Sequence, residues 1–301
     1  MSISHSFDLI AGTSAGGIVA LALGAGLAPH EIVTHFKSLV RTVFPSARRR
    51  WWHWPRQLTS PIYDADALRK ALEGVLGERI LGDSAKRLVI PAWDVQVGTV
   101  HIFKTPHHRR LRRDWRHPMV DVALATSAAP VYFSAACVDD HRLIDGGVWA
   151  NNPSVVSIAE AVSMLDVPLE AIRVLNIGTI DQRTNHPKGL DRGGLLNWVK
   201  PIAPLILDAG SRGGQGIAEH LIGKDDYTRF DASVPGELYS LDSVNSESVA
   251  GLAAHVSRDL SPTYEELFAS HKATKYTPLL GNRRNNDMTT TSPTEDPDAT
   301  C

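Results

Sequence analysis

Short apolar runs and longer stretches of helical spacing alternate along the first two-thirds of the chain. Apolar runs predict strands at residues 7–11, 87–95, 100–104, 142–145 and 172–177. Apolar positions three and four residues apart predict helices at 15–26, from Pro29 to Val43, after Asp64 as N-cap, and at 118–127 and 153–165. Strands that alternate with helices indicate an α/β fold, with a mostly parallel sheet sandwiched by helices.

The last third of the chain has a different pattern. Residues 195–223 are apolar with helical spacing, but Pro201, Pro204 and several glycines interrupt them. We interpret this segment as a core helix in preference to a lid over a site. Residues 246–271 predict one long helix or two shorter ones. From residue 281 the composition changes to Asn, Thr, Asp and Pro, which is typical of disorder. We therefore expect one domain over 1–280 and a disordered tail over 281–301.

A serine motif lies between the first predicted strand and the first predicted helix. Gly12-Thr13-Ser14-Ala15-Gly16 fits the G-x-S-x-G pattern of a nucleophile elbow. A serine on so sharp a turn has a strained backbone. We expect the turn to leave no room for a Cβ at the neighbouring Gly12 and Gly16. The alternative is a glycine-rich turn that only lets strand and helix pack closely. We favour a catalytic serine because strand, turn and helix occur in the required order.

A serine nucleophile needs a base, and Asp145 is the candidate. It ends a predicted strand and is followed by Gly146 and Gly147. Open α/β sheets have their sites at the carboxyl ends of strands, where this carboxylate would lie. Taken alone, Asp145 is equally well explained as a turn residue or a helix cap.

Four segments in this order resemble the patatin-like phospholipase family, namely residues 12–17, 125–133, 145–153 and 174–179. The resemblance extends from about residue 7 to 179, and more loosely to about 231. It implies a patatin-like α/β fold and a lipid acyl hydrolase without cofactor or metal. The implied substrate is a phospholipid or an acylglycerol, cleaved at its carboxylic ester.

The resemblance also implies roles for individual residues. Ser14 would be the nucleophile and Asp145 its base, as a Ser–Asp dyad without a catalytic histidine. The elbow and its oxyanion support would come from Gly12, Ala15, Gly16 and Gly17. A Ser-His-Asp hydrolase is the less favoured alternative, for which the thirteen histidines supply candidates such as His220 and His255.

One feature of the family pattern is missing from this sequence. The family has a glycine-rich oxyanion loop before the serine, but residues 1–6 contain no glycine. Loss of one oxyanion donor typically costs about 2.7–4 kcal/mol of barrier. Either the natural chain begins further upstream, or the protein is a catalytically impaired lipid-binding relative. We favour the first explanation because both the Ser14 and the Asp145 motifs are intact.

Two basic segments bear on possible partners. The first, at residues 48–56, combines arginine with tryptophan, side chains that suit the membrane–water interface. Its alternative is a solvated loop with tryptophans in the core. Its candidate membrane contacts are Arg48, Arg49, Arg50, Trp51, Trp52 and Trp54. The second, at residues 104–117, is interpreted as a solvated charge run in preference to a patch that attracts anionic lipid head groups. The net charge of −2 and the lack of a binding motif argue against nucleic acid as a partner.

No segment of the chain is typical of secretion or of membrane spanning. The first residues lack a basic and apolar signal pattern, and the longest apolar stretch, 16–27, is too short for a bilayer. We therefore expect a cytoplasmic protein whose membrane contact is at most peripheral.

Overall fold

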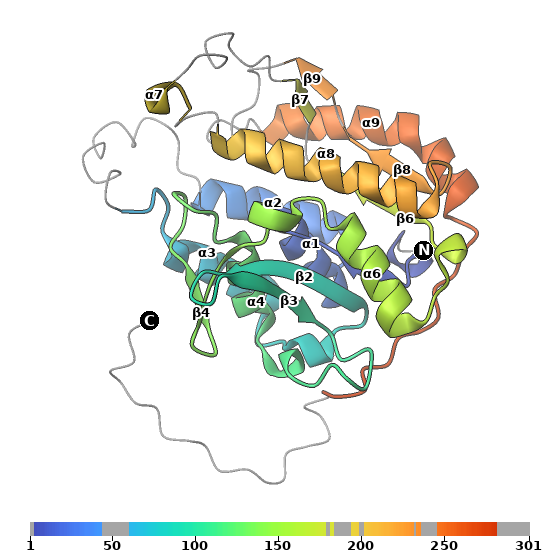
Figure 1. Ribbon diagram of the computed structural model, residues 1–301, viewed down its shortest axis with the longest axis horizontal. Helices are drawn as coiled ribbons and strands as arrows, with labels where there is room; N and C mark the ends of the chain where they lie inside the picture. Colours follow the sequence, from blue (N-terminus) through green and yellow to red (C-terminus); the bar gives the residue numbers. More distant parts are fainter. Residues whose placement is uncertain are drawn as a thin grey trace.

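The computed structural model describes residues 3–43, 60–178, 181–183, 194–198, 202–231, 233–235 and 246–281 (Figure 1). Its strands are β1 (Leu9–Ala11), β2 (Arg87–Asp94), β3 (Thr99–Lys104), β4 (Ala136–Val138), β5 (His141–Asp145), β6 (Val174–Ile177), β7 (Asp181–Arg183), β8 (Tyr227–Phe230) and β9 (Ser233–Pro235). Its α-helices are α1 (Ala15–Gly24), α2 (Pro29–Val43), α3 (Ala65–Leu76), α4 (Met119–Ser127), α5 (Gly147–Ala150), α6 (Ser154–Leu165), α7 (Leu195–Trp198), α8 (Ile202–Ile222) and α9 (Ser246–Leu267).

Most predicted elements are present, within a few residues of their expected ends. Asp64 caps α3 as expected, because its Oδ1 accepts the N–H of Asp66 at 2.9 Å. Residues 246–267 form one helix that includes Pro262, and the segment 195–223 divides into α7 and α8. The short strands β4, β7, β8 and β9 were not predicted. Three or four residues are too few for a clear alternation of apolar and polar positions.

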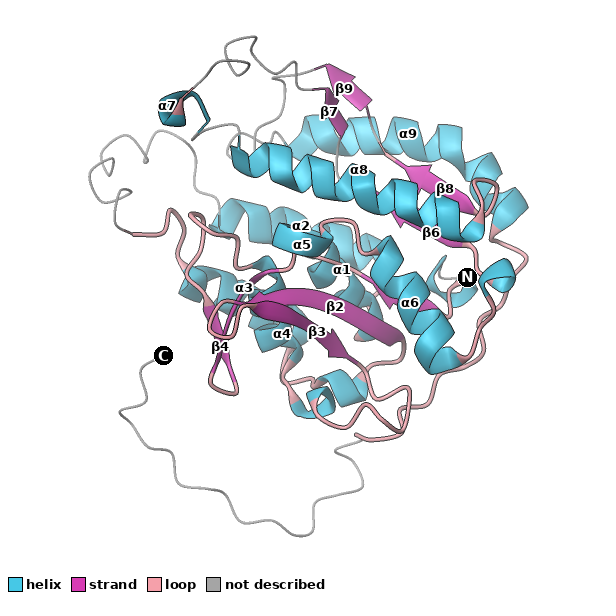
Figure 2. Cartoon of the chain, in the orientation of Figure 1, coloured by secondary structure: helices cyan, strands magenta, loops and turns pink. Residues whose placement is uncertain are grey.

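Strand β2 is the centre of the main sheet (Figure 2). It pairs in parallel with β1 and antiparallel with β3 and β5, and β5 forms a hairpin with β4. Two separate parallel pairs, β6–β8 and β7–β9, lie outside that sheet. The predicted α/β architecture is confirmed, and the sheet is mixed because β3, β4 and β5 form antiparallel pairs.

The main core lies between this sheet and helices α1, α3 and α4. Its fully buried residues include Leu88 and Ile90 of β2, Leu21 of α1 and Leu72 of α3. The three residues of strand β1 are only partly buried, although they belong to an apolar run. The reason is its place in the sheet, because among the described strands β1 has β2 as its one pairing partner.

Helix α8 packs against α5 and α6, the two helices that follow Asp145 in the sequence (Figure 2). A second, smaller core joins α6 and α8 to β8 through Ile158, Ala218, Ile222 and Tyr227. Ala218 and Ile222 of α8 are buried, whereas Ile206, Ile217 and Leu221 are exposed, so α8 is a helix packed on one face and not the core helix expected for residues 195–223.

Two predictions lie outside the described residues. These are the basic and aromatic segment with Arg48–Arg50, Trp51, Trp52 and Trp54, and the tail from residue 282 onward. Of the helices that the structure describes, none has the length and apolar character needed to cross a bilayer.

Candidate active site

Strands β1 and β5 run toward each other along one edge of β2. Ala11, the last residue of β1, is opposite Val89, and Asp145, the last residue of β5, is opposite Ala92. The backbone groups of alternate residues of a strand point to the same edge, so Val89 and Pro91 share the edge that both strands use. Because Pro91 has no N–H to pair, the ladder can stop there without leaving an unsatisfied donor. Both carboxyl ends therefore meet beside Pro91.

This arrangement corrects one part of the sequence argument. The expectation was that Asp145 ends a strand at the common carboxyl edge of a parallel sheet. Instead β5 is antiparallel to β2, and the two strand ends converge from opposite directions in the middle of the sheet. The predicted proximity of Ser14 and Asp145 is therefore reached by a different strand geometry.

Ser14 has the backbone that an elbow requires, with φ 55° and ψ −126°. A non-glycine residue in this region is strained, and such strain persists only where the surroundings hold it. Gly12 is required at the turn because a Cβ there would collide with the carbonyl of Gly16. Gly16 itself differs from expectation, since a Cβ on it would meet no atom within 4 Å. Steric crowding therefore explains the first glycine of the motif and not the last.

Thr126, at the end of α4, makes a contact with the elbow that the sequence did not predict. Its Oγ1 accepts the N–H of Ser14 at 3.1 Å and donates to the carbonyl of Pro91 at 2.6 Å. Gly17 packs directly on it, because a Cβ at Gly17 would be 2.7 Å from the Thr126 methyl carbon. The only signal for this residue was its place in the small-residue segment 125–133.

Asp145 is 5% exposed and is surrounded by neutral groups. Its Oδ1 accepts the N–H of Gly147 at 2.7 Å, and the Ser14 side chain hydrogen-bonds to the carboxylate. Burial raises the pKa of Asp145 above its usual value, and these two hydrogen bonds lower it by less. The result is a carboxylate that accepts a proton more readily than an exposed one.

The backbone around Asp145 is fixed on both sides. Its own N–H donates to the carbonyl of Ala128 at 3.0 Å. After it, Gly146 lies so close to Pro91 that a Cβ would collide with the Pro91 carbonyl. Thr13 of the elbow donates its hydroxyl to the carbonyl of Ala150 at 2.7 Å, which ties the elbow to the segment after Asp145.

Comparison with known proteins identifies the family of this chain. The model of the family described as patatin-like phospholipase matches residues 3–156, which include the elbow, Thr126 and Asp145. The chain belongs to the patatin-like phospholipase family. Membership supports a hydrolase that acts on lipids, and the predicted family resemblance is confirmed.

Three similar bacterial proteins of this family carry the name cGAMP-activated phospholipase. The one from Vibrio cholerae serotype O1 is 32% identical over 298 residues, covering 90% of this chain and 82% of that protein. The one from Pseudomonas aeruginosa is 32% identical over 253 residues, covering 82% and 74%. The one from Escherichia coli is 38% identical over 191 residues, covering 60% and 53%.

The histidines proposed for a Ser-His-Asp triad lie elsewhere. His255 is exposed and pairs with Asp259 of its own helix at 3.1 Å. His220 is exposed near the end of α8. Helix α8 passes the site at Leu207, whose carbonyl accepts a hydrogen bond from Asn151. His220 is about 20 Å from Leu207 along the axis of this helix. Among the described residues, no histidine is a hydrogen-bond partner of either Ser14 or Asp145.

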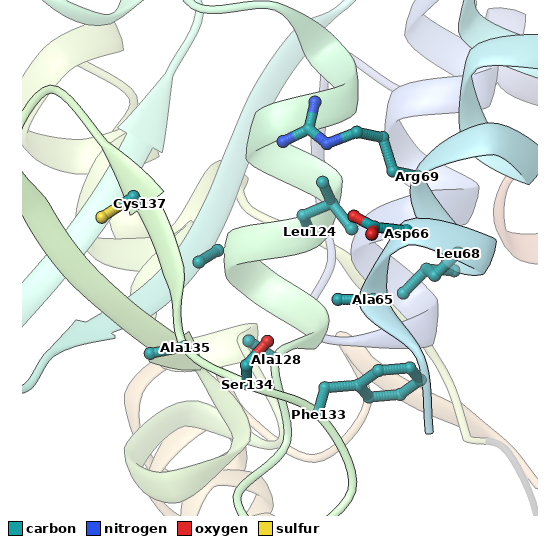
Figure 3. Close-up of a pocket in the computed structure, with 11 residues that line it drawn as sticks. Ala65, Asp66, Leu68, Arg69, Leu124, Ala128, Phe133, Ser134, Ala135 and Cys137 are labelled. Carbon is teal, nitrogen blue, oxygen red and sulfur yellow. The ribbon is translucent and has the colours of Figure 1, made fainter. Parts of the chain in front are cut away.

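A cavity of about 180 Å³ lies next to the end of α4 (Figure 3). It is bounded by the start of α3, by Leu124 and Ala128 at the end of α4, and by residues 133–137. Ala128 thus lines the cavity while its carbonyl accepts the N–H of Asp145. Across the described part of the chain, no group of three or more His, Cys, Asp or Glu residues is arranged to hold a metal ion.

Proposed function

We propose that the protein hydrolyses the acyl esters of phospholipids or acylglycerols with Ser14 as nucleophile and Asp145 as base. The observation that carries this proposal is the hydrogen bond between the Ser14 hydroxyl and a buried carboxylate whose pKa is raised. A base that is more proton-accepting than an exposed carboxylate is suited to activate a hydroxyl directly. Membership of a phospholipase family supports lipid esters as the substrate class.

In the first step, the Ser14 oxygen attacks the ester carbonyl carbon while its proton passes to the Asp145 carboxylate. The tetrahedral intermediate then expels the lipid alkoxide, which takes that proton and leaves as an alcohol. The acyl group stays on the Ser14 oxygen as an ester. In the second step, Asp145 removes a proton from water, the hydroxide attacks the acyl carbon, and the fatty acid leaves as Ser14 regains its proton.

The negative charge on the carbonyl oxygen needs hydrogen-bond donors. Ala15 is the first residue of α1, and the first N–H groups of a helix have no acceptor within it. The positive end of the helix dipole acts at the same place. The open space above Gly16 leaves room for a substrate to approach the elbow.

The direct test is fatty acid release from mixed phospholipid and acylglycerol vesicles by wild type, Ser14→Ala and Asp145→Asn. Both variants should lose activity while keeping the wild-type circular dichroism spectrum. His220→Ala and His255→Ala serve as controls and should retain wild-type activity. Wild-type activity in Ser14→Ala or Asp145→Asn would refute the dyad, and loss of activity in a histidine variant that still folds would favour a triad.

A second candidate function is lipid binding without turnover. In that case a lipid would bind beside Ser14 and Asp145 without the hydrogen-bond donors that stabilise an oxyanion. A fluorophosphonate probe separates the two, because it reacts only with an activated serine. Labelling of the 301-residue chain that is absent in Ser14→Ala would exclude the binding-only alternative. No labelling of a folded wild type would support it.

We also propose that a cyclic dinucleotide regulates the activity. The support is that three relatives, two of them matching more than 80% of this chain, are named cGAMP-activated phospholipases. Fatty acid release should then rise on addition of cGAMP and stay unchanged with linear dinucleotides of the same bases. Equal activity with and without cGAMP would refute regulation and leave the hydrolase proposal standing.

A further inference from the structure

The Thr126 hydroxyl occupies the break in the sheet where β1 and β5 meet. It accepts the Ser14 N–H at 3.1 Å and donates to the Pro91 carbonyl at 2.6 Å. Thr126 is fully buried, so water does not compete for either bond. A hydroxyl has one proton, and its donation to Pro91 fixes the direction in which the remaining lone pairs face Ser14.

The N–H of Ser14 has no strand partner available at this position. Strand β1 ends at Ala11, and the Pro91 carbonyl, which faces the same edge of β2, accepts the Thr126 hydroxyl and not the Ser14 N–H. A buried N–H without an acceptor is unfavourable, and here it belongs to a residue held at φ 55°. The Thr126 oxygen supplies the acceptor that the interrupted sheet does not.

The same turn of α4 also holds the acid. Two residues after Thr126, the carbonyl of Ala128 accepts the N–H of Asp145 at 3.0 Å. Thr126 and Ala128 thus fix Ser14 and Asp145 relative to a common element, although the two partners come from strands of opposite direction.

We infer that Thr126 is a positioning residue, which holds the strained Ser14 backbone so that its hydroxyl faces Asp145. This inference rests on the proposed function of Ser14 and Asp145. Thr126 does not touch substrate in this role, because its hydroxyl is committed to Ser14 and Pro91. Its effect should therefore appear in turnover and in serine reactivity, with little change in substrate binding.

The test compares Thr126→Val, which keeps the shape and the methyl group but lacks the acceptor, with Thr126→Ser, which keeps the hydroxyl. Ser127→Ala is the matched control, because within the described residues that buried hydroxyl bonds to the Ala123 carbonyl of its own helix, at 2.6 Å, and not to the elbow. The assays are kcat and KM on a soluble short-chain ester, and the rate of fluorophosphonate labelling.

Thr126→Val should lower kcat and the labelling rate by about 10- to 100-fold with KM within about 2-fold, as expected for a misplaced nucleophile. Thr126→Ser and Ser127→Ala should stay within about 3-fold of wild type. Should Thr126→Val not fold, Thr126→Ala against Thr126→Ser makes the same comparison.

Two results would overturn the inference. One is a hydroxyl-free variant that folds and keeps wild-type kcat, and the other is a Thr126→Ser variant as impaired as Thr126→Val. Ser14→Ala is measured alongside, because activity in that variant would refute the proposed function itself.

Discussion

Asp145 and Glu160 are both almost fully buried carboxylates, but their surroundings shift their pKa values in opposite directions. Asp145 meets the neutral hydroxyl of Ser14 and the N–H of Gly147, so burial prevails and its pKa rises. Burial acts in the same direction on Glu160, but hydrogen bonds from His107 and Lys104 and their nearby charge outweigh it. The pKa of Glu160 is therefore lowered.

The two environments suit different purposes. Glu160 of α6 binds Lys104 and also His107, whose Nε2 lies 3.0 Å from its Oε1. His107 in turn is hydrogen-bonded through Nδ1 to Thr105 at 2.9 Å. These bonds attach α6 to the end of β3. A buried carboxylate that pairs with a lysine is costly to separate from its partner, whereas one held by neutral groups keeps the proton affinity that the proposed base needs.

The largest expected effect comes from removing the charge of Asp145. Asp145→Asn keeps an oxygen for the Gly147 N–H but cannot take a proton from Ser14. Fatty acid release should fall by about 10²- to 10⁴-fold, the usual contribution of a general base. The free energy of unfolding at pH 8 should not decrease, because a desolvated charge has been removed. A variant that keeps its activity, or that loses stability instead, would break the comparison.

Removing the charge of Glu160 should have the converse result. Glu160→Gln leaves Lys104 without its counter-charge in a buried site and removes a carboxylate oxygen that is hydrogen-bonded to His107. Urea unfolding at pH 7 should show that the free energy of unfolding falls by about 3–5 kcal/mol. The activity per folded molecule should stay at the wild-type level.

The control for this experiment is the exposed pair of His255 and Asp259. Asp259→Asn should change the free energy of unfolding by less than about 0.5 kcal/mol, because solvent screens this pair. A Glu160→Gln variant no less stable than Asp259→Asn would show that the buried cluster does not stabilise the fold.

Close backbone packing holds Asp145 in place, whereas Glu160 is held by side-chain bonds to Lys104 and His107. Gly146→Ala would drive a methyl group into the Pro91 carbonyl and shift the backbone that holds Asp145. We expect a loss of about 1–3 kcal/mol in unfolding free energy together with reduced turnover. Gly16→Ala is the matched control, since its methyl group has open space, and its thermal midpoint should equal that of wild type. Equal behaviour of the two variants would contradict the packing argument.

The smallest effects are those of pH, at about 1.4 kcal/mol for each unit of pKa shift. Because the pKa of Asp145 is raised in the folded state, its contribution to stability is present at low pH and is lost as pH rises through that pKa. Glu160 behaves oppositely because its pKa is lowered in the folded state. Its contribution to stability is present at pH values above the ordinary glutamate pKa and is lost as pH falls through the folded pKa. Urea unfolding of wild type, Asp145→Asn and Glu160→Gln between pH 3 and pH 9 separates the two.

Activity supplies an independent pH measurement. The acid limb of kcat/KM should lie above 3.8, the ordinary value for an aspartate, because the base form of Asp145 is needed. An acid limb at or below 3.8 would show that another group is the base.

The sequence by itself determined the local features of this protein. Apolar spacing was sufficient to predict helices α1 to α4 and strands β2 and β3, since each pattern lies within one continuous segment. Ser14 and Asp145 were predicted as a pair from two motifs, and the structure brings them together. Lys104 shows the limit of such reasoning. It was assigned to a solvated charge run, yet its side chain is largely buried and bonded to Glu160.

Only the tertiary structure decided how these pieces meet. The direction of β5, the break at Pro91 and the contact of Thr126 with Ser14 depend on strand pairing between distant segments. The ion pair of Lys104 with Glu160 likewise joins residues far apart in the chain. Local propensity and hydrophobic spacing act over a few residues, so they fix each element and its buried face. The same strand can pair in either direction without changing that pattern, and the choice is made by packing of the whole chain.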